Sequence, residues 1–304
     1  MKAEKIMKEK AVTFYQAFSN LPPERFKGVT AVYAFCRYAD DLVDKHMIDR
    51  DDNTILKSLF DLENAVKFIY SNENGSYSDK NLILQEDWWP AFEHTVKKIN
   101  IPSKGFFMQI NGQRMDLSSN DIKTFDEFIE YCRLVAGSVG LMMIPFLVRS
   151  EKDMNEDFVK SCEELGIAMQ ITNILRDVGE DLREKNKVYL PASLLEKYGI
   201  TRKELETLSK YNSEERIEEL IPKNFISLWE KLASIADGYY ASFEKKLSYF
   251  HPDCAAIVFA AAMMYRGIAD AVREASYNCF TKRCYTPEHI RKAVIVEAKL
   301  INHI

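Results

Sequence analysis

The chain has 304 residues, 47% of them hydrophobic, and a formal net charge of -5. This acidic balance, without a basic stripe, excludes a protein that binds the phosphate backbone of nucleic acids. Its 11 glycines and 9 prolines fall below average usage, which favours long helices over many short strands. The length permits a large core and one or two domains.

The cysteines and the apolar stretches indicate where such a chain would reside. The six cysteines are scattered, and none has the spacing of a zinc site or a redox motif, which predicts reduced core residues in a cytoplasmic protein. The N-terminal residues lack the apolar segment of a signal peptide. The longest uncharged stretches, residues 134–148 and 254–265, are shorter than the ~20 residues of a membrane span. They predict buried helices rather than transmembrane segments.

Segments with helical periodicity follow one another along the chain, separated by polar breaks. They cover residues 4–18, 23–46, 53–70, 82–98, 103–115, 124–148, 155–183, 214–247, 252–277 and 287–300. Prolines near the starts of two of them, Pro23 and Pro102, fit helix N-termini. Strict alternation of apolar and polar residues is not sustained anywhere, so no strand is predicted. We therefore expect an all-α protein in which residues 1–304 form one domain, a single helical bundle.

The predicted helix over residues 23–46 carries a polar stripe on an otherwise apolar surface. Arg37, Asp40, Asp41 and Asp44 fall at positions i, i+3, i+4 and i+7, so they share one helix face. Like charges at i and i+4 weaken a helix by ~0.2–0.5 kcal/mol per pair, so helix stability does not account for them. The plainer alternative is a solvated face with an Arg37–Asp41 ion pair.

A second predicted helix repeats this pattern in the middle of the chain. Gln170, Asn173, Asp177 and Asp181 run at positions i, i+3, i+7 and i+11, and Arg176 lies beside them. A solvated face with an ion pair inside the helix is again the alternative, but two matching stripes on apolar helices argue against it. Burying several carboxylates without partners is costly, and bound cations remove that cost.

The residue types in both stripes indicate which ligand they would hold. Asp, Asn and Gln supply hard oxygen ligands, which suit Mg2+ better than zinc. Mg2+ is usually bound by a few carboxylates together with substrate phosphate oxygens, and the two arginines would clamp the phosphates. Two facing stripes would therefore hold a diphosphate group.

The rest of the ligand should be apolar. Phe14 and Phe18 share a helix face just before the first acidic stripe. Residues 134–143 combine small and large apolar side chains. This composition fits close helix packing at Gly137 and Gly140, room for a long hydrocarbon, or both.

Four blocks of the chain follow one another in a specific order. They are residues 33–44 (YAFCRYADDLVD), 111–117 (NGQRMDL), 131–140 (YCRLVAGSVG) and 170–181 (QITNILRDVGED), the last followed by 188–191 (VYLP). In these blocks the chain resembles the squalene/phytoene synthase family, the head-to-head isoprenoid synthases, over nearly its whole length. The resemblance implies an isoprenoid-synthase helical bundle around a central hydrophobic cavity. It also implies that two allylic prenyl diphosphates form a cyclopropyl diphosphate, which then rearranges to a linear 1-1' linked hydrocarbon.

The resemblance implies roles for individual residues. The Mg2+ ligands would be Asp40, Asp44, Asn173, Asp177 and Asp181. The catalytic residues would be Asp40, Asp44, Asp177, Asp181, Tyr131 and Arg176. The substrate would be bound by Thr13, Phe14, Phe18, Arg37, Asp41, Gln170, Asn173, Lys187, Tyr189, Tyr265 and Arg283.

The chain departs from the family pattern at three places. Many relatives carry a serine-rich segment before the first aspartates, where only Thr13 supplies a hydroxyl here. Lys187 stands where an arginine is common, which keeps a charge but loses the bidentate fork. Thr30 stands where many relatives have tryptophan, and it would enlarge one wall of the cavity. Asp116, in the second block, is interpreted as a structural ion-pair partner.

The branch of the family is a further hypothesis. The sequence shows no terminal membrane anchor and no Gly-rich dinucleotide fingerprint, which favours the carotenoid branch over squalene synthases that use NADPH. Phe18 stands where a bulky residue shortens the tunnel in dehydrosqualene-forming relatives. We therefore expect Mg2+-dependent 1-1' condensation of two farnesyl diphosphates, via presqualene diphosphate, to dehydrosqualene (4,4'-diapophytoene). Diphosphate would be released, NADPH would not be used, and the product would enter carotenoid biosynthesis.

Several alternatives stay open. The chain could use two geranylgeranyl diphosphates as a phytoene synthase, or NADPH as a squalene synthase. A terpene cyclase or a chain-elongating prenyltransferase would share the facing acidic helices, and an inactive helical prenyl-lipid-binding protein would be non-enzymatic. The expected partners are prenyl diphosphates, without nucleic acid and without a transmembrane segment. Release of an apolar product would involve peripheral membrane contact.

Overall fold

A computed structural model describes residues 2–44, 52–71, 82–117, 121–212 and 216–301. Within them the chain is helical and contains no β-strand, which confirms the all-α prediction. The α-helices are α1 (Lys2–Lys10), α2 (Val12–Phe18), α3 (Pro23–Asp44), α4 (Asp52–Tyr70), α5 (Trp89–Ile99), α6 (Lys104–Leu117), α7 (Phe125–Cys132), α8 (Ser138–Leu147), α9 (Glu156–Arg176), α10 (Val178–Lys185), α11 (Ala192–Lys197), α12 (Arg202–Ser209), α13 (Lys223–Glu244), α14 (Pro252–Glu274) and α15 (Glu288–Ile301). Short 3-10 helices are η1 (Leu82–Gln85), η3 (Glu151–Asp153) and η4 (Leu247–Tyr249), and η2 (Arg133–Gly137) is π-helical.

Several helices begin where the sequence predicted, at positions where an apolar period starts together with residues typical of a first helical turn. Helices α3, α4, α6, α14 and α15 begin within one residue of the predicted starts. Proline opens both α3 and α14, where its fixed φ suits the first turn and its missing N–H leaves no hydrogen bond unmade.

The structure corrects several predicted helices. The segment predicted over 4–18 divides at Ala11, whose φ of -139° and ψ of 63° interrupt the helix. The segment predicted over 214–247 begins only at Lys223, and α11 and α12 were not predicted at all. Helices this short contain too few turns to display an apolar period.

The most consequential correction concerns the second acidic stripe. The segment predicted as one helix over 155–183 divides at Asp177, with φ of -104° and ψ of 15°, into α9 and α10. The amide of Asp177 still donates to the carbonyl of Asn173 at 2.9 Å, and the amide of Asp181 donates to the carbonyl of Asp177 at 2.9 Å. The chain therefore turns at Asp177 while these two backbone hydrogen bonds are kept, although the amide of Gly179 donates to the carbonyl of Cys279 on another segment.

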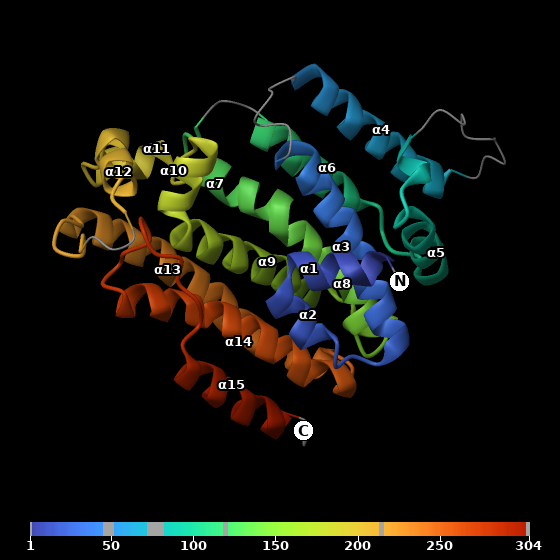
Figure 1. Ribbon diagram of the computed structural model, residues 1–304. Helices are drawn as coiled ribbons and strands as arrows, with labels where there is room; N and C mark the ends of the chain where they lie inside the picture. Colours follow the sequence, from blue (N-terminus) through green and yellow to red (C-terminus); the bar gives the residue numbers. More distant parts are fainter. Residues whose placement is uncertain (1, 45–51, 72–81, 118–120, 213–215, 302–304) are drawn as a thin grey trace.

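Helix α9 lies in the middle of the bundle (Figure 1). It packs against α8, α13 and α14, while α15 covers the outer side of α14 and α4 lies at the opposite edge, against α6. One apolar core extends from Ala3 to Val294, and all six cysteines are buried and unpaired. Polar side chains on the inward faces of α3 and α9 therefore sit inside the bundle.

Helices α8 and α9 cross at very short range. A side chain at Gly140 on α8 would place its Cβ 2.3 Å from the carbonyl oxygen of Cys162 on α9, so only glycine fits. The interpretation of close packing at this position is confirmed. The adjoining segment η2 is π-helical, a form that often occurs at functional sites.

A loop near the C-terminus is held against the start of α10. The amide of Gly179 donates to the carbonyl of Cys279 at 3.0 Å, and the Arg183 guanidinium donates to the carbonyl of Phe280. A Cβ at Gly179 would lie 1.9 Å from the Phe280 carbonyl oxygen. This contact fixes residues 278–283 relative to the second acidic stripe.

Two helical stretches are long and apolar enough to cross a membrane by length and composition, Phe125–Leu147 and Pro252–Glu274. In the structure 44% and 67% of their most apolar windows are buried inside the bundle. Core helices of this kind pass the same test, so these stretches are weak evidence for a membrane span. Their apolar character is explained by their packing against α9.

Candidate active site

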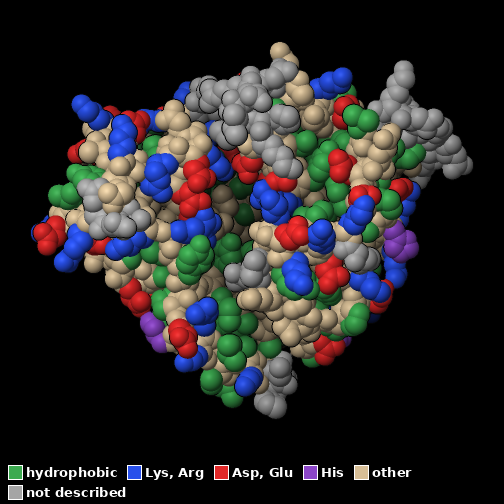
Figure 2. All heavy atoms as spheres, viewed as in Figure 1, with side chains coloured by type: hydrophobic (Ala, Val, Ile, Leu, Met, Phe, Trp, Pro, Cys, Tyr) green, Lys and Arg blue, Asp and Glu red, His purple; other side chains and the backbone are tan. Residues whose placement is uncertain are grey.

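The two acidic stripes adjoin in space. Lys185, at the end of α10, places its Nζ 3.4 Å from a carboxylate oxygen of Asp44, at the end of α3. The charge of Lys185 also acts on Asp181, on its own helix, and on Asp40, on α3. Figure 2 shows the surface hollowed near the centre of this face, with charged side chains on the rim and hydrophobic ones deeper inside. The carboxylates of α3 and α10 thus face a common space.

Asp40 is held by neutral donors from another part of the chain. One of its carboxylate oxygens accepts hydrogen bonds from the side-chain amides of Gln109, at 3.1 Å, and Gln113, both on α6. Ser138, on α8, donates to the Gln109 side-chain oxygen at 2.7 Å, so the Gln109 NH2 group must face Asp40. These three supporting side chains are buried.

Burial and crowding weaken the acidity of two carboxyls. The pKa of Asp40 is raised to about 7, mainly by burial, with a contribution from the negative charges of Asp44 and Asp116 and with Arg37 and Lys185 opposing the rise. Burial also raises the pKa of Asp181 to about 7, where Lys185 opposes the effect and Asp116 adds to it. A site that holds both groups ionised needs additional positive charge.

Both predicted phosphate-clamping arginines are paired with acids of their own stripe. Arg37 pairs with Asp41 one turn along α3. Arg176 donates to both carboxylate oxygens of Asp177, at 2.7 and 2.5 Å. Arg283, from the C-terminal loop, lies 3.8 Å from the same Asp177 carboxylate and pairs with Glu180. In this arrangement Asp177 is engaged by arginine, so the pair must separate before either group could bind a metal or a phosphate.

The donor set fits a hard divalent cation that arrives with its own phosphate ligands. The Asn173 side-chain oxygen is buried and has no hydrogen-bond partner in the described part of the chain, and its amide nitrogen reaches Gln170 at 3.5 Å. In that part of the chain, no three His, Cys, Asp or Glu side chains converge closely enough to enclose a metal ion alone. Mg2+ commonly takes only one or two carboxylates and completes its shell with water and phosphate oxygens.

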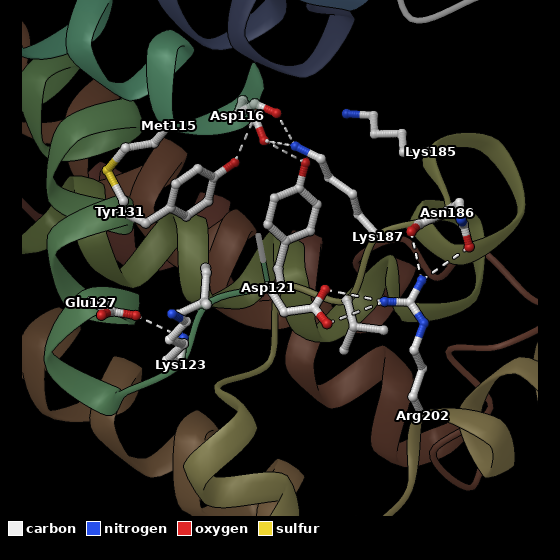
Figure 3. A pocket seen from close by; sticks show the side chains of 13 residues that line it. Met115, Asp116, Asp121, Lys123, Glu127, Tyr131, Lys185, Asn186, Lys187 and Arg202 are labelled. Atoms are coloured by element: carbon white, nitrogen blue, oxygen red, sulfur yellow. Dashed lines mark hydrogen bonds and ion pairs between the residues drawn. The ribbon is translucent and has the colours of Figure 1, made fainter. Parts of the chain in front are cut away.

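Asp116 joins three predicted site residues at one carboxylate (Figure 3). Tyr131 donates to it at 3.2 Å, Tyr189 at 2.8 Å and Lys187 at 3.0 Å. The Tyr131 and Tyr189 rings stack with centroids 5.2 Å apart, and burial raises the pKa of the Tyr131 hydroxyl. The ion-pair role expected for Asp116 is therefore observed, and its partners are residues of the candidate site.

A cavity of about 460 Å³ opens beside this cluster. Its lining includes Asp116, Tyr131 and Lys185, and on the other side Arg202, which binds Asp121 at 3.1 Å. Figure 3 shows the side chains of Tyr131 and Lys187 pointing toward Asp116 from two different segments. The cavity therefore lies next to the space between the acidic stripes.

Aromatic rings form the apolar side of the site. Phe14 and Phe18 on α2 stack with centroids 5.8 Å apart, and Phe14 also contacts Tyr265 of α14 at 5.3 Å. Thr13 directly precedes Phe14 in the chain, but its side chain is outside the part that the structure describes. Thr30 is fully buried and donates to the carbonyl of Lys27, so its hydroxyl is satisfied within α3.

The residues that sequence reasoning missed are those that support others. Gln109, Gln113 and Ser138 hold Asp40, and Lys185 bridges toward Asp44. Two buried glutamines one turn apart on α6 were an available signal, because buried polar side chains almost always have partners.

Comparison with known proteins agrees with this architecture. The sequence matches the squalene/phytoene synthase family model over residues 7–289. It is 32% identical over 290 residues to the phytoene synthase of Arthrospira platensis, covering 91% of this chain and 84% of that protein. It is 28% identical over 273 residues to the 4,4'-diapophytoene synthase of Staphylococcus haemolyticus, covering 90% and 87%.

A solved structure extends the agreement to three dimensions. The crystal structure of a dehydrosqualene synthase in complex with ligand has a TM-score of 0.79 to this chain, with 30% identity, covering 98% of this chain and 94% of the other. The matched region includes both acidic stripes and the Asp116 cluster. The chain belongs to the squalene/phytoene synthase family.

Proposed function

We propose that this protein condenses two farnesyl diphosphates head to head, via presqualene diphosphate, to dehydrosqualene (4,4'-diapophytoene), with release of diphosphate. The observation that carries the proposal is the meeting of two acidic helix faces, α3 and α10, at the Lys185–Asp44 contact. The reaction would serve carotenoid biosynthesis and take place in the cytoplasm, with NADPH playing no part.

The site fits Mg2+ brought by the substrate, and its ligands would be the set Asp40, Asp44, Asn173, Asp177 and Asp181. When bound, Mg2+ neutralises the leaving diphosphate. Asp40 is already oriented by its amide donors, and Asn173 offers an unpaired oxygen. The protein's own contribution is to hold these oxygens in place in a partly water-excluded space.

The arginines would leave their carboxylate partners and bind the diphosphate oxygens. Arg37, Arg176 and Arg283 each pair with an acid of the site. Released from these ion pairs, the guanidinium groups would bind phosphate oxygens bidentately. Gln170 and Asp41 lie beside them on the same stripes and would complete the polar wall.

Tyr131 would order the carbon skeleton near the leaving group. Its hydroxyl donates to Asp116, as do the Tyr189 hydroxyl and the Lys187 ammonium group. The stacked tyrosine rings present an electron-rich face to an allylic cation, an interaction worth ~0.5–2 kcal/mol. The same cluster keeps water from reaching the cation.

The length of the prenyl chain is assigned from the aromatic end of the site. Phe14, Phe18 and Tyr265 lie against one another, and at the end of a substrate tunnel they would exclude a longer chain, which favours fifteen carbons. The identity to phytoene synthases supports a second candidate, condensation of two geranylgeranyl diphosphates. Either product is an insoluble hydrocarbon, so we propose peripheral membrane contact for its release.

Product analysis tests the proposal. The enzyme is incubated with Mg2+ and either pure farnesyl or pure geranylgeranyl diphosphate, with and without NADPH, and the hydrocarbons are identified by mass. We expect a thirty-carbon product from farnesyl diphosphate whose mass is unchanged by NADPH. Phe18→Ala should raise use of geranylgeranyl diphosphate, whereas Phe26→Ala, which packs on Tyr15 instead, should not.

Each other outcome selects a different function. A forty-carbon product formed in preference identifies a phytoene synthase, and a reduced product that requires NADPH identifies a squalene synthase. A fifteen-carbon hydrocarbon identifies a cyclase. Prenyl-diphosphate binding that is unchanged by EDTA and leads to no turnover identifies a lipid-binding protein.

A further inference from the structure

The solvent-facing side of α15 carries aliphatic side chains, although a side that faces water is ordinarily polar. The helix buries Val294, 5% exposed, toward α14, and Thr286 just before it donates to the carbonyl of Met264 on α14. On the opposite side, Val296 and Leu300 are 61% and 64% exposed. The helix is thus docked on the bundle by one side and presents aliphatic side chains on the other.

These exposed residues form a regular stripe. Lys292, Ile295, Val296, Lys299 and Leu300 fall at i, i+3, i+4, i+7 and i+8, so they share one face, here called the α15 outer face. This spacing ordinarily marks the side of a helix that is buried. All five residues are exposed. The face is therefore patterned for burial without being buried in the structure.

The charges on α15 complement an anionic surface. The helix carries three basic and two acidic residues, whereas the whole chain has a net charge of -5. Lys292 and Lys299 lie within the outer face itself. A helix that lies in a membrane interface combines an apolar stripe with lysines whose long stems follow the apolar surface while their ammonium groups reach the lipid phosphates.

A second copy of the chain is a poorer partner for this face. A stable interface between proteins buries about 800 Å² on each side and involves roughly 20–30 residues. The outer face consists of five side chains on one helix, two of them lysines that would face each other across a symmetric contact. A bilayer can bind a narrow stripe of this kind, because the apolar side chains insert between the lipids and no large complementary protein surface is needed.

The position of α15 relates it to the apolar end of the site. It packs on α14, and α14 carries Tyr265, whose ring lies 5.3 Å from that of Phe14. Figure 2 shows hydrophobic side chains, with Lys and Arg beside them, gathered at the lower part of the view, where α15 lies in Figure 1. One helix therefore separates the outer face from the aromatic residues of the site.

We propose that the α15 outer face docks the protein on an anionic phospholipid bilayer. Val296, Leu300 and Ile295 enter the interface, and Lys292 and Lys299 contact lipid phosphates. The reason for docking at this face rests on the proposed function, because an insoluble hydrocarbon leaves the site more readily into a nearby bilayer. The docking itself is independent of turnover.

Vesicle sedimentation without substrate tests the docking. The full chain is mixed with vesicles of phosphatidylcholine alone or with added phosphatidylglycerol, at low and high salt. We expect binding that requires phosphatidylglycerol and decreases with salt. Val296→Glu with Leu300→Glu should weaken binding about tenfold or more, since the buried aliphatic groups are replaced by charge. Lys292→Glu with Lys299→Glu should abolish the preference for phosphatidylglycerol.

Two surface variants serve as controls. Leu220→Glu changes a side chain that is 51% exposed, and Phe60→Glu changes one that is 56% exposed on α4. Neither should alter vesicle binding. Loss of binding in Phe60→Glu but not in the α15 variants would move the docking surface to α4 and overturn the proposal, as would equal binding of all variants. A wild-type dimer that becomes monomeric on Val296→Glu would assign the face to a second copy instead.

Turnover of detergent-dispersed farnesyl diphosphate separates this inference from the proposed function. An α15 variant that keeps wild-type turnover and its circular dichroism spectrum but does not sediment has lost docking alone. A wild-type chain that binds vesicles yet makes no product from any prenyl diphosphate leaves the docking intact and refutes the proposed reaction.

Discussion

On α3, Asp40 is held by neutral amides from another helix, whereas at the junction of α9 and α10 Asp177 is held by arginines. The first carboxylate accepts both of these hydrogen bonds on one oxygen, which fixes its orientation. The second must leave Arg176 before it can bind anything else. If the site binds a cation as proposed, the half around Asp40 is already oriented for it, and the half around Asp177 is expected to rearrange.

The backbones of the two acidic stripes differ as well. Helix α3 runs without a break from Pro23 to Asp44, so its stripe keeps one geometry. The second stripe turns at Asp177, between α9 and α10, and its acids lie on two segments. A break at this point gives Asp177 a different approach from the rest of the stripe, and it lets the C-terminal loop reach the same carboxylate through Arg283.

The largest expected effect comes from removing an acid on either side. Asp40→Ala and Asp181→Ala should each lower Mg2+-dependent release of diphosphate by about 10³-fold, because each removes a proposed ligand of the cation that would neutralise the leaving diphosphate. Phosphate-release kinetics at saturating Mg2+ measure this. Asp121→Ala is the matched control, since Asp121 lines the neighbouring cavity but binds Arg202. Comparable losses in all three variants would contradict the assignment of the acidic stripes.

Arg176→Lys should affect only the half of the site around Asp177. Lysine keeps the charge but not the bidentate fork, so we expect kcat/KM to fall about 10²-fold while the Mg2+ requirement changes little. Steady-state kinetics at several Mg2+ concentrations separate the two quantities. If Arg176 only restrains Asp177, the variant should instead bind Mg2+ more tightly, and the proposed phosphate contact would be wrong.

Gln113→Leu tests the half of the site around Asp40. Loss of this donor to Asp40 should raise the half-saturating Mg2+ concentration about tenfold and leave kcat at saturating Mg2+ within about twofold of the wild type. Asn111→Ala, a neighbour that binds Arg114 on the surface of α6, is the control and should change neither quantity. A lower kcat with unchanged Mg2+ dependence would show that Gln113 does not act through the metal ligand.

The smallest effect is a dependence of stability on pH. Asp40 and Asp181 have folded-state pKa values of about 7 against an ordinary value of 3.8. Between those values the unfolded chain has released protons that the folded chain still binds, so stability falls as pH rises through this window. In EDTA we expect Tm to drop by a few degrees from about pH 5 to about pH 8.

The asparagine variants provide the matching comparison. A chain with both Asp40→Asn and Asp181→Asn should show a flatter dependence of Tm on pH in thermal denaturation. Mg2+ with diphosphate should raise Tm most at high pH, where both carboxylates are ionised. A wild-type Tm that rises with pH in EDTA would contradict the raised pKa values.

The sequence was sufficient for features that follow from helical periodicity. The common face of Asp40 and Asp44 follows from a spacing of four residues on a helix whose other sides are apolar, and the structure has that helix. The start of α14 was predictable because Pro252 coincides with the beginning of an apolar period. The helical class followed from the same regularities.

Contacts between distant segments were not predictable in this way. Gln113 meets Asp40 across 73 positions of sequence, and no local pattern records that pairing. The turn at Asp177 coincides with a contact between the C-terminal loop and α10, and no local pattern records that contact. The pairing of Arg176 with Asp177 was also missed, because adjacent residues do not face each other on an ideal helix.

The backbone contact between Gly179 and Phe280 has a consequence for engineering this enzyme. At 1.9 Å, the space for a Cβ is already filled by a carbonyl oxygen, so even a single methyl group at position 179 would force the two segments apart. Residues 178–185 and 278–283 should consequently be exchanged together when a chimaera is built. A chimaera that takes one segment from a relative without the other would therefore have mismatched backbones next to the second acidic stripe.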